Sequence, residues 1–263
     1  MQWIEFHDQP WFPRSFRDGV TDALQFIMNL GGVYDPIVPR LNSALESAGT
    51  HRIVDLCSGA GGPWLRIQPI LEQQIHQPVE VYLTDKYPNV VTLKEVRRAS
   101  HGKINYSADP IDAASLPPHL KGFRTIFSSY HHFDSQQAAA ILLNAVNNGQ
   151  GVGIFEAARR HPLTIILVAA MPLMSLLVSP FIRPFRFSRL FWTYILPVIP
   201  FVLFYDGVVS CLRAYSTSTL LRLTRNLPAQ NYQWQIGEEN RALHVLPITY
   251  LVGFPHAQNA KSA

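Results

Sequence analysis

The sequence predicts an α/β protein built on a doubly wound, mainly parallel sheet. Residues 51–156 alternate short β-branched segments with stretches whose apolar residues recur at helical spacing. A glycine-rich loop follows the first of these segments. Strands separated by helices are joined by right-handed crossovers, so we expect the strands to lie parallel in one sheet with helices on both faces.

Seven segments have the composition of strands, namely residues 52–56, 79–84, 104–107, 124–128, 152–155, 232–236 and 247–253. Helices are expected over residues 18–30, from the glycine loop to about 75, and over 90–99, 135–147 and 216–225. This order divides the chain into four parts. They are an N-terminal helical cap at 1–48, a core that carries the glycine loop at 49–158, an apolar helical insertion at 159–214, and the C-terminal part of the same sheet at 215–263.

The composition excludes several classes of protein. Charged residues make up 15% of the chain, against about 25% in an ordinary soluble domain, and 48% of the residues are hydrophobic. The formal net charge of +4 is small and scattered, so no nucleic-acid partner is expected. Cys57 and Cys211 are too few for a disulfide scaffold. Glu5 and Asp8 interrupt the first apolar residues, which is not the pattern of a signal peptide, so we expect a cytoplasmic protein.

The glycine-rich loop runs from Asp55 to Trp64 and reads DLCSGAGGPW. Glycines let a ligand lie directly on the backbone, with N–H groups pointing at it. A dinucleotide fingerprint would place a third glycine where Trp64 stands, which counts against NAD or FAD. Asp55 would repel a pyrophosphate but suits a ligand that carries an ammonium group. S-adenosylmethionine has that ammonium and no phosphate.

Two further carboxylates follow the next strands. Asp85 ends the second strand, where it could accept hydrogen bonds from both hydroxyls of a ribose. Alternatively, Asp85 is a solvated loop acid. Asp112 follows the third strand and could bind an adenine amino group, with Asp109 as a nearby competitor.

Together these residues resemble the class I S-adenosylmethionine-dependent methyltransferases over residues 52–156. The resemblance extends to a bacterial branch with a hydrophobic insertion after the fifth strand, through Trp11-Phe12-Pro13, His131-His132-Phe133 and the segment DGVVSCLRAY at 206–215. It implies a Rossmann-like, seven-stranded sheet whose last strand is antiparallel, and S-adenosyl-L-methionine as the cofactor. The expected cofactor contacts are Asp55, Cys57, Ser58, Gly59, Ala60, Gly61, Asp85, Lys86, Asp112, Ala113 and Ser129.

The candidate catalytic residues lie at the ends of the fourth and fifth strands. Methyl transfer is an in-line displacement, for which the protein aligns the reactants and removes at most one proton. His131 and His132 are candidate general bases, or they bond to loop backbone and shape the pocket. Glu156 lies at the same rim, or it pairs with Arg159 or Arg160. No residue is assigned to a metal.

Two apolar runs, residues 163–182 and 190–205, approach the length of membrane spans. A spanning hairpin would place Arg183, Arg186 and Arg189 outside, against the positive-inside rule, and prolines interrupt both runs. We therefore favour an apolar lid over the site that contacts one membrane leaflet peripherally or monotopically, with its arginines near anionic headgroups. A purely internal lid and a true span are the alternatives.

These features predict methyl transfer to a small-molecule acceptor that is apolar, aromatic or lipid-like. Oxygen, nitrogen and carbon acceptors all fit the same mechanism. One alternative is an NAD(P)-dependent oxidoreductase on a related fold, which Trp64 and Asp55 disfavour. Another is a non-catalytic, membrane-associated protein that retains the fold.

Overall fold

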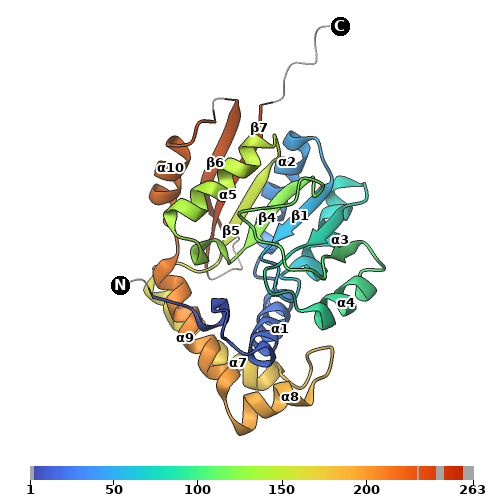
Figure 1. The fold of residues 1–263 in the computed structure, drawn as a ribbon, viewed down its shortest axis with the longest axis vertical. Helices are drawn as coiled ribbons and strands as arrows, with labels where there is room; N and C mark the ends of the chain where they lie inside the picture. Colours follow the sequence, from blue (N-terminus) through green and yellow to red (C-terminus); the bar gives the residue numbers. More distant parts are fainter. Residues whose placement is uncertain (1–2, 230, 241–245, 257–263) are drawn as a thin grey trace, which may run out of the picture.

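The computed structural model describes residues 3–229, 231–240 and 246–256, and a seven-stranded sheet forms its centre (Figure 1). The strands are β1 (Arg52–Leu56), β2 (Glu80–Leu83), β3 (Ile104–Tyr106), β4 (Phe123–Phe127), β5 (Val152–Glu156), β6 (Tyr232–Glu239) and β7 (Ile248–Pro255). Their order across the sheet is β3-β2-β1-β4-β5-β7-β6. Each predicted strand is therefore present, with its ends displaced by three residues at most.

The first five strands are parallel and the last strand is antiparallel to both of its neighbours. Asp55 of β1 lies between Leu83 of β2 and Thr125 of β4 in the register. The chain order reverses at β1, where β2 lies on one side and β4 on the other, and ligands of doubly wound folds bind outside the carboxyl ends of the strands at such a point. The prediction of a doubly wound, mainly parallel sheet is confirmed.

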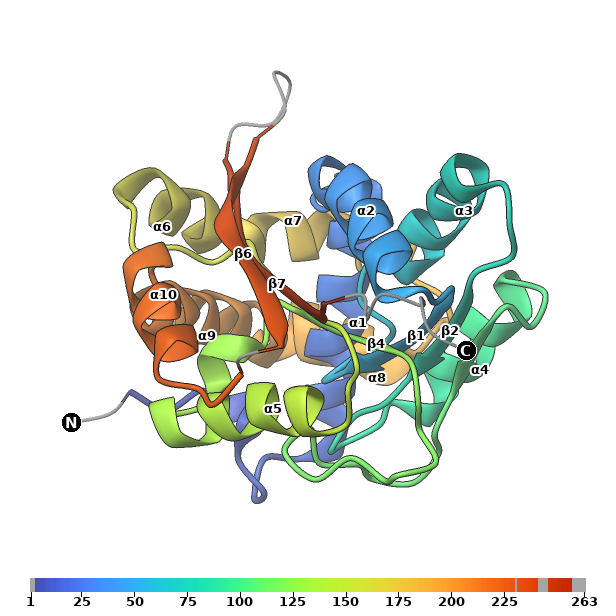
Figure 2. The ribbon, with the colours of Figure 1, turned by 90° about the horizontal axis from the view of Figure 1, so that it is seen from above.

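Helices cover both faces of this sheet (Figure 2). The helices of the sheet layers are α2 (Val38–Ala48), α3 (Trp64–Ile75), α4 (Val90–Ala99), α5 (Ser135–Asn147) and α10 (Thr217–Arg225). Buried residues of α2, α3 and α4 share one apolar cluster, and those of α5 and α10 share the cluster on the opposite face. The amphipathic periodicity that predicts α4, α5 and α10 thus buries their apolar sides against the strands.

The segment predicted as an N-terminal cap divides between two places. Helix α2 packs on α3 and β7, and its Leu41 and Leu45 are fully buried in a sheet cluster. Helix α1 (Arg14–Leu30) instead packs on the insertion, where Val20 and Ala23 join a third cluster. Phe12 and Phe16 join this packing, and the ring centroids of Phe16 and Trp192 are 4.7 Å apart, whereas Trp3 and Trp11 are exposed.

The insertion forms a layer of short helices beyond the carboxyl ends of the strands (Figure 1). It consists of α6 (Pro162–Ala169), α7 (Met171–Val178), α8 (Phe187–Leu190), a π-helical segment η4 (Phe191–Ile195) and α9 (Val198–Arg213). Of the described helices, none is by itself long and apolar enough to cross a membrane. The adjoining elements Phe187–Ile195 and Val198–Arg213 meet those criteria together, with a bend of 75° between them.

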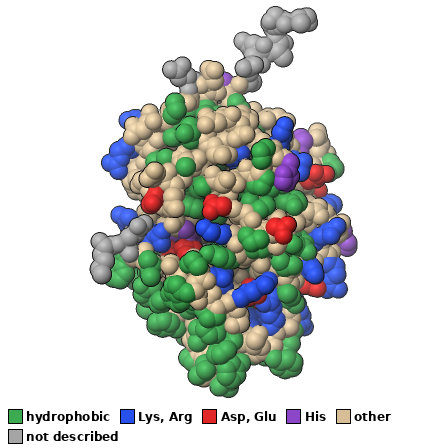
Figure 3. All heavy atoms as spheres, viewed as in Figure 1, with side chains coloured by type: hydrophobic (Ala, Val, Ile, Leu, Met, Phe, Trp, Pro, Cys, Tyr) green, Lys and Arg blue, Asp and Glu red, His purple; other side chains and the backbone are tan. Residues whose placement is uncertain are grey.

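Hydrophobic side chains gather on the outer surface of this insertion (Figure 3). The large apolar side chains exposed there include Ile166, Leu173, Leu177, Phe181, Phe187, Ile195 and Phe201. The expectation that the insertion arginines face headgroups is wrong for two of them. Arg186 and Arg189 turn inward to Asp18 and Asp22 of α1, and the Arg189 side chain is 1% exposed. Arg183 remains exposed.

Candidate functional site

The glycine loop leaves β1 at the centre of the sheet and enters α3. Gly61 has φ of +107°, and a Cβ atom there would lie 3.2 Å from Val96 Cγ2, so this position requires glycine on both counts. Gly62 has φ of +49° and nothing lies within 4 Å of where its Cβ would stand. The loop therefore packs tightly against α4 at Gly61 and presents bare backbone at Gly62.

Asp85 holds the loop in place. Its Oδ2 accepts a hydrogen bond of 2.7 Å from the Gly59 N–H, and its Oδ1 accepts one of 2.6 Å from the Tyr87 N–H. Burial raises the pKa of the Asp85 carboxyl, and the two backbone donors oppose that shift. The alternative that Asp85 is a solvated loop acid is wrong. Its side chain holds the glycine-rich loop after β1 through the hydrogen bond from the Gly59 N–H.

Asp55 lies beneath the loop and is 2% exposed. Thr125 Oγ1 donates to its Oδ1 at 2.6 Å, and Ser58 Oγ donates to its Oδ2 at 2.7 Å. Burial raises the pKa of Asp55 to about 7, although these two hydroxyl donors favour the ionised form. Near neutral pH the group is therefore poised between its charged and neutral forms.

A cavity of about 600 Å³ extends from the glycine loop to the helical insertion. All the residues predicted to contact the cofactor line it except Gly61, which faces α4 instead. Asp112 lines the cavity, and its Oδ2 lies 3.2 Å from Lys86 Nζ. The opposite wall comes from the insertion and α1 and includes Val20, Leu24, Thr164, Leu167, Val168, Met171 and Leu203. One end of the cavity is thus polar backbone and carboxylates, and the other is apolar.

His131 and Glu156 meet beside this cavity. The Nδ1 atom of His131 lies 2.7 Å from Glu156 Oε2, and the Tyr130 N–H donates to Glu156 Oε1 at 2.7 Å. Burial lowers the pKa of His131, but the Glu156 carboxylate more than compensates and the pKa rises to about 10. Glu156 therefore pairs with His131. The expected alternative of Arg159 or Arg160 is wrong, because Arg159 binds Glu238 and Arg160 is exposed.

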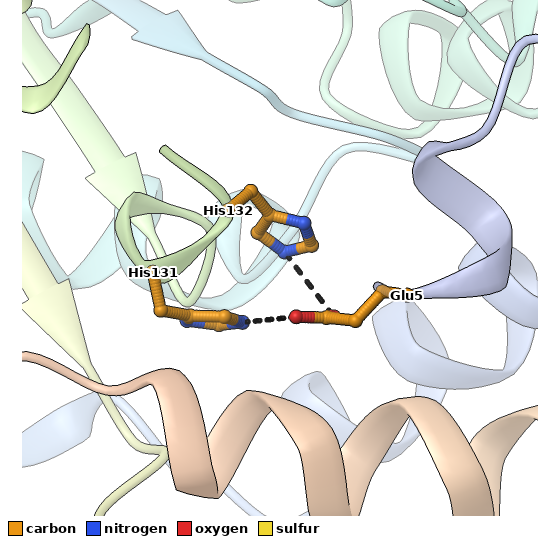
Figure 4. Close-up of side chains that lie close together, drawn as sticks. All are labelled: Glu5, His131 and His132. Carbon is orange, nitrogen blue, oxygen red and sulfur yellow. Dashed lines mark ion pairs between the residues drawn. The ribbon is translucent and has the colours of Figure 1, made fainter. Parts of the chain in front are cut away.

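Glu5 reaches both histidines from the amino-terminal segment (Figure 4). Its Oε1 lies 3.7 Å from His131 Nε2, and its Oε2 lies 3.7 Å from His132 Nε2. The His132 Nδ1 atom makes a short hydrogen bond to Asp8 Oδ2. Burial would raise the pKa of the fully buried Glu5, but His132 and His131 lower it well below its usual range. The strand ends and the amino-terminal segment thus form one network of charges.

Asp206 of α9 anchors this amino-terminal segment. Its Oδ1 accepts from the Phe6 N–H at 2.8 Å, and its Oδ2 lies 2.7 Å from His7 Nδ1. Burial lowers the pKa of His7, but the hydrogen bond to Asp206 dominates the outcome and raises it to about 9. Arg213 Nη2 donates to the His132 carbonyl at 2.6 Å. The segments 131–133 and 206–215 are therefore in direct contact.

The sequence pattern did not assign Glu5, His7 or Asp8 to the site. Each lies far from His131 in the sequence, and no spacing rule relates them. The available signal was the occurrence of two acids and a histidine within four residues of an otherwise aromatic amino-terminal segment.

This chain is similar to several solved structures. One is an O-methyltransferase family protein from Burkholderia thailandensis, with a TM-score of 0.52 and 14% identity over 91% of this chain. This chain spans 59% of that protein's length. A putative Zn-dependent alcohol dehydrogenase from Rhodobacter sphaeroides has a TM-score of 0.49, with 13% identity over 91% of this chain and 98% of its own. A SAM-dependent methyltransferase from Aquifex aeolicus has a TM-score of 0.48, with 12% identity over 87% and 92%.

No protein-family model matches the sequence, and no curated protein matches it either. The likeness to the Burkholderia thailandensis protein, together with the strand order, shows that the chain has the Rossmann-like fold of the class I methyltransferases.

Proposed function

We propose that this protein is an S-adenosylmethionine-dependent methyltransferase acting on a small apolar, aromatic or lipid-like acceptor. The observation that carries the proposal is the single cavity shared by the glycine loop and the apolar insertion. Its volume of about 600 Å³ lies in the range of small-molecule sites. A cofactor over the loop would therefore share one cavity with an acceptor beneath the insertion.

The cofactor would lie across the carboxyl ends of β1, β2 and β4. In this position the ammonium group would face Asp55 and the ribose hydroxyls would face Asp85. The adenine would lie on the side of Asp112. The exposed ion pair of Lys86 and Asp112 lies at this edge and could open to admit an amino group. The remaining contacts would be Cys57, Ser58, Gly59, Ala60, Ala113 and Ser129, mostly through the backbone, whereas Gly61 would shape the loop from its position against α4.

Trp64 supports this cofactor over a dinucleotide. The Trp64 side chain is fully buried at the start of α3, with its ring centroid 5.4 Å from that of Phe127. Close approach of that helix beneath a pyrophosphate depends on a glycine at this position. Asp55, buried under the loop, would also oppose a nearby pyrophosphate.

His131, His132 and Glu156 would form the catalytic end of the cavity. S-adenosylmethionine supplies an activated methyl group, so the protein's task is to align the acceptor and manage one proton. The raised pKa keeps His131 protonated at neutral pH, with Nδ1 held by Glu156 and Nε2 facing Glu5, so this ring would act through its positive charge beside the cavity. His132 would then be the candidate proton acceptor, with Glu156 fixing the orientation of His131.

The insertion would contact one leaflet of a membrane. Its exposed surface is apolar over α7, α8 and α9, and large exposed apolar patches mark protein or membrane contacts. Because Arg186 and Arg189 are paired with acids inside the protein, this contact would depend on apolar area more than on charge. A lipid-like acceptor could then enter the cavity from the leaflet.

Transfer of a labelled methyl group tests the proposal. Purified protein would be incubated with labelled S-adenosylmethionine and a panel of phenols, amines and hydroxylated lipids, with the Asp85→Asn variant as a matched control. We expect label in at least one acceptor with the wild-type protein and a loss of about tenfold or more with the variant. A panel that stays unlabelled although the protein binds the cofactor would reject this acceptor class.

A further inference from the structure

The carboxylate of Glu5 and the two facing imidazoles have the arrangement of metal ligands (Figure 4). We propose that Glu5, His131 and His132 bind one divalent first-row transition-metal ion, such as Zn²⁺ or Fe²⁺. Their ligand atoms all lie within 4.8 Å of one another. Two histidines and one carboxylate form a recurrent ligand set for these ions.

Both imidazoles are oriented by a second carboxylate. Glu156 holds Nδ1 of His131, and Asp8 holds Nδ1 of His132, so in each ring the Nε2 atom faces Glu5. Histidine ligands of protein metal sites almost always bond to a carboxylate, carbonyl or water through the other ring nitrogen. The site would therefore have its supporting shell as well as its ligands.

The distances fit an ion better than they fit hydrogen bonds. Glu5 lies 3.7 Å from each Nε2 atom, which is too long for a hydrogen bond. Two ligands about 2.0–2.1 Å from a tetrahedral ion lie about 3.4 Å apart, so a small contraction would close the site. The Nε2 atom of His131 is buried without a hydrogen-bond partner, and Glu5 is fully buried. A buried nitrogen that faces a buried carboxylate at 3.7 Å without a hydrogen bond is an observation that an ion between them would explain.

The charges of the network also accommodate an ion. The buried or half-buried acids of the cluster are Glu5, Asp8, Glu156 and Asp206. Arg213 Nη1 lies 3.5 Å from Glu5 Oε1 and supplies one permanent positive charge among these four carboxylates. The excess of carboxylates would favour a divalent cation between them.

A neighbouring set of residues is a weaker candidate. His7, Asp8 and His132 also lie within metal-binding distance of one another. However, His7 Nδ1 is bonded to Asp206, and His132 Nδ1 is bonded to Asp8. An ion there could bind His7 only through Nε2, which lies 3.8 Å from Asp8 Oδ1, and use of His132 Nδ1 would break its bond to Asp8. The Glu5 site uses Nε2 atoms that make no hydrogen bond.

The ion would lie in the wall of the cavity, because His131 and His132 both line it. Three protein ligands leave room for a water molecule or an acceptor oxygen. A nitrogen that binds an ion does not accept a proton, so His132 would not act as the base when the ion is bound. The ion would instead polarise the acceptor oxygen. The binding site itself does not depend on the proposed methyl transfer.

Titration of the full-length, untagged protein with Co²⁺ after chelator treatment tests this inference. Bound Co²⁺ has a visible absorption band that depends on its coordination. Displacement of Co²⁺ by Zn²⁺ then measures the affinity of the same site for Zn²⁺. We expect one equivalent of Co²⁺ to bind. The Glu5→Gln and His131→Asn variants should bind about 100-fold more weakly, and Glu156→Gln about 10- to 100-fold more weakly.

Two matched variants locate the ion. His119 is exposed and outside the cluster, so His119→Asn should bind Co²⁺ as the wild-type protein does. His7→Asn should retain the band if the ion lies at Glu5 and lose it if the ion lies at the neighbouring set. Circular dichroism and the melting temperature without metal would confirm that each variant is folded.

The inference is overturned if wild-type protein binds neither Co²⁺ nor Zn²⁺ at micromolar concentration, or if folded Glu5→Gln and His131→Asn bind as tightly as wild type. Should both variants fail to fold, the rise in melting temperature of the wild-type protein with Zn²⁺, and its reversal by chelator, decides the question. These measurements are independent of cofactor binding, so their failure would leave the methyltransferase proposal intact.

Discussion

Arg189 in the helical insertion and Asp22 in α1 form a buried ion pair with Nη1 and Oδ2 2.7 Å apart. The two side chains are 1% and 0% exposed. Asp22 also accepts a hydrogen bond of 2.6 Å from Thr92 Oγ1 in α4, and Arg189 Nη2 donates to the Ile182 carbonyl at 2.7 Å. The insertion is therefore tied through α1 to α4 on the sheet.

Removing one partner of this pair should destabilise the protein strongly. Asp22→Asn leaves the Arg189 guanidinium buried without a counter-charge, which costs about 3–5 kcal/mol. Urea unfolding would measure the free energy of unfolding. As a control, Glu95→Gln breaks the exposed Glu95–Arg98 pair. It should change the free energy of unfolding by less than about 1 kcal/mol. Equal effects in the two variants would show that the buried pair does not hold the lid.

Asp85→Asn should weaken the binding of S-adenosylhomocysteine by about tenfold or more, since a ribose hydroxyl loses a charged acceptor. The same change weakens the bonds to the Gly59 and Tyr87 N–H groups, so stability should fall by about 1–2 kcal/mol. Calorimetry and thermal melting measure the two effects separately. Unchanged affinity in a destabilised variant would leave Asp85 with a structural role alone.

The buried Asp55 should make stability depend on pH. Its folded-state pKa of about 7 exceeds the ordinary value of 3.8, so the folded state binds this proton more tightly than the unfolded state. The resulting stabilisation is complete below pH 3.8 and is lost as the pH rises through about 7. It amounts to about 4 kcal/mol. Relative to wild type, Asp55→Asn should therefore gain stability between pH 4 and pH 7, as measured by urea unfolding at each pH.

The same group should couple cofactor binding to pH. An ammonium group next to Asp55 favours the carboxylate, so the affinity for S-adenosylhomocysteine should rise by up to about tenfold per pH unit below pH 7 and level off above it. Binding of adenosine, which has no ammonium group, is the matched comparison and should lack this rise. A parallel pH dependence for both ligands would contradict the assignment of Asp55.

Membrane contact should be lost when the apolar lid surface is made polar. Leu177→Ser combined with Phe187→Ser removes two side chains that are 67% and 81% exposed, and should weaken sedimentation with phosphatidylcholine vesicles by tenfold or more. Leu221→Ser removes an exposed leucine of α10 outside the lid and should have no effect. Anionic lipid should add little, because Arg160 and Arg183 are the exposed arginines among the insertion's residues 159–214. If the double variant binds vesicles as strongly as the wild-type protein does, the apolar surface of the insertion does not face the membrane.

Much of the sheet could be predicted because its signals are local. The strand that leads to Asp55 and the loop at Gly59 and Gly61 are contiguous in the sequence. The strand is indicated by its own apolar residues and the loop by its own glycines. Asp85 and Asp112 follow from the same logic, since parallel strands bring their carboxyl ends to one edge of the sheet. Helix α2 was not predicted as part of the sheet layers, because residues 1–48 as a whole were predicted to form a helical cap.

The rest of the site arises from contacts between distant segments. Nothing in the spacing of Glu5 indicates that it lies against His131 and His132, because that contact requires α9 to hold the amino-terminal segment through Asp206. Arg189 was misread for a similar reason. A basic residue between two apolar runs suggests a headgroup contact, and the acid that buries it lies in α1.

Calorimetric titration of the purified protein with S-adenosylhomocysteine, run beside NADH, tests the central claim most directly. We expect binding of S-adenosylhomocysteine at one site with a dissociation constant of about micromolar order, and no response to NADH. Binding of NADH alone would contradict the account in favour of an oxidoreductase. Folded protein that binds neither ligand would contradict it in favour of a non-catalytic protein that retains the fold.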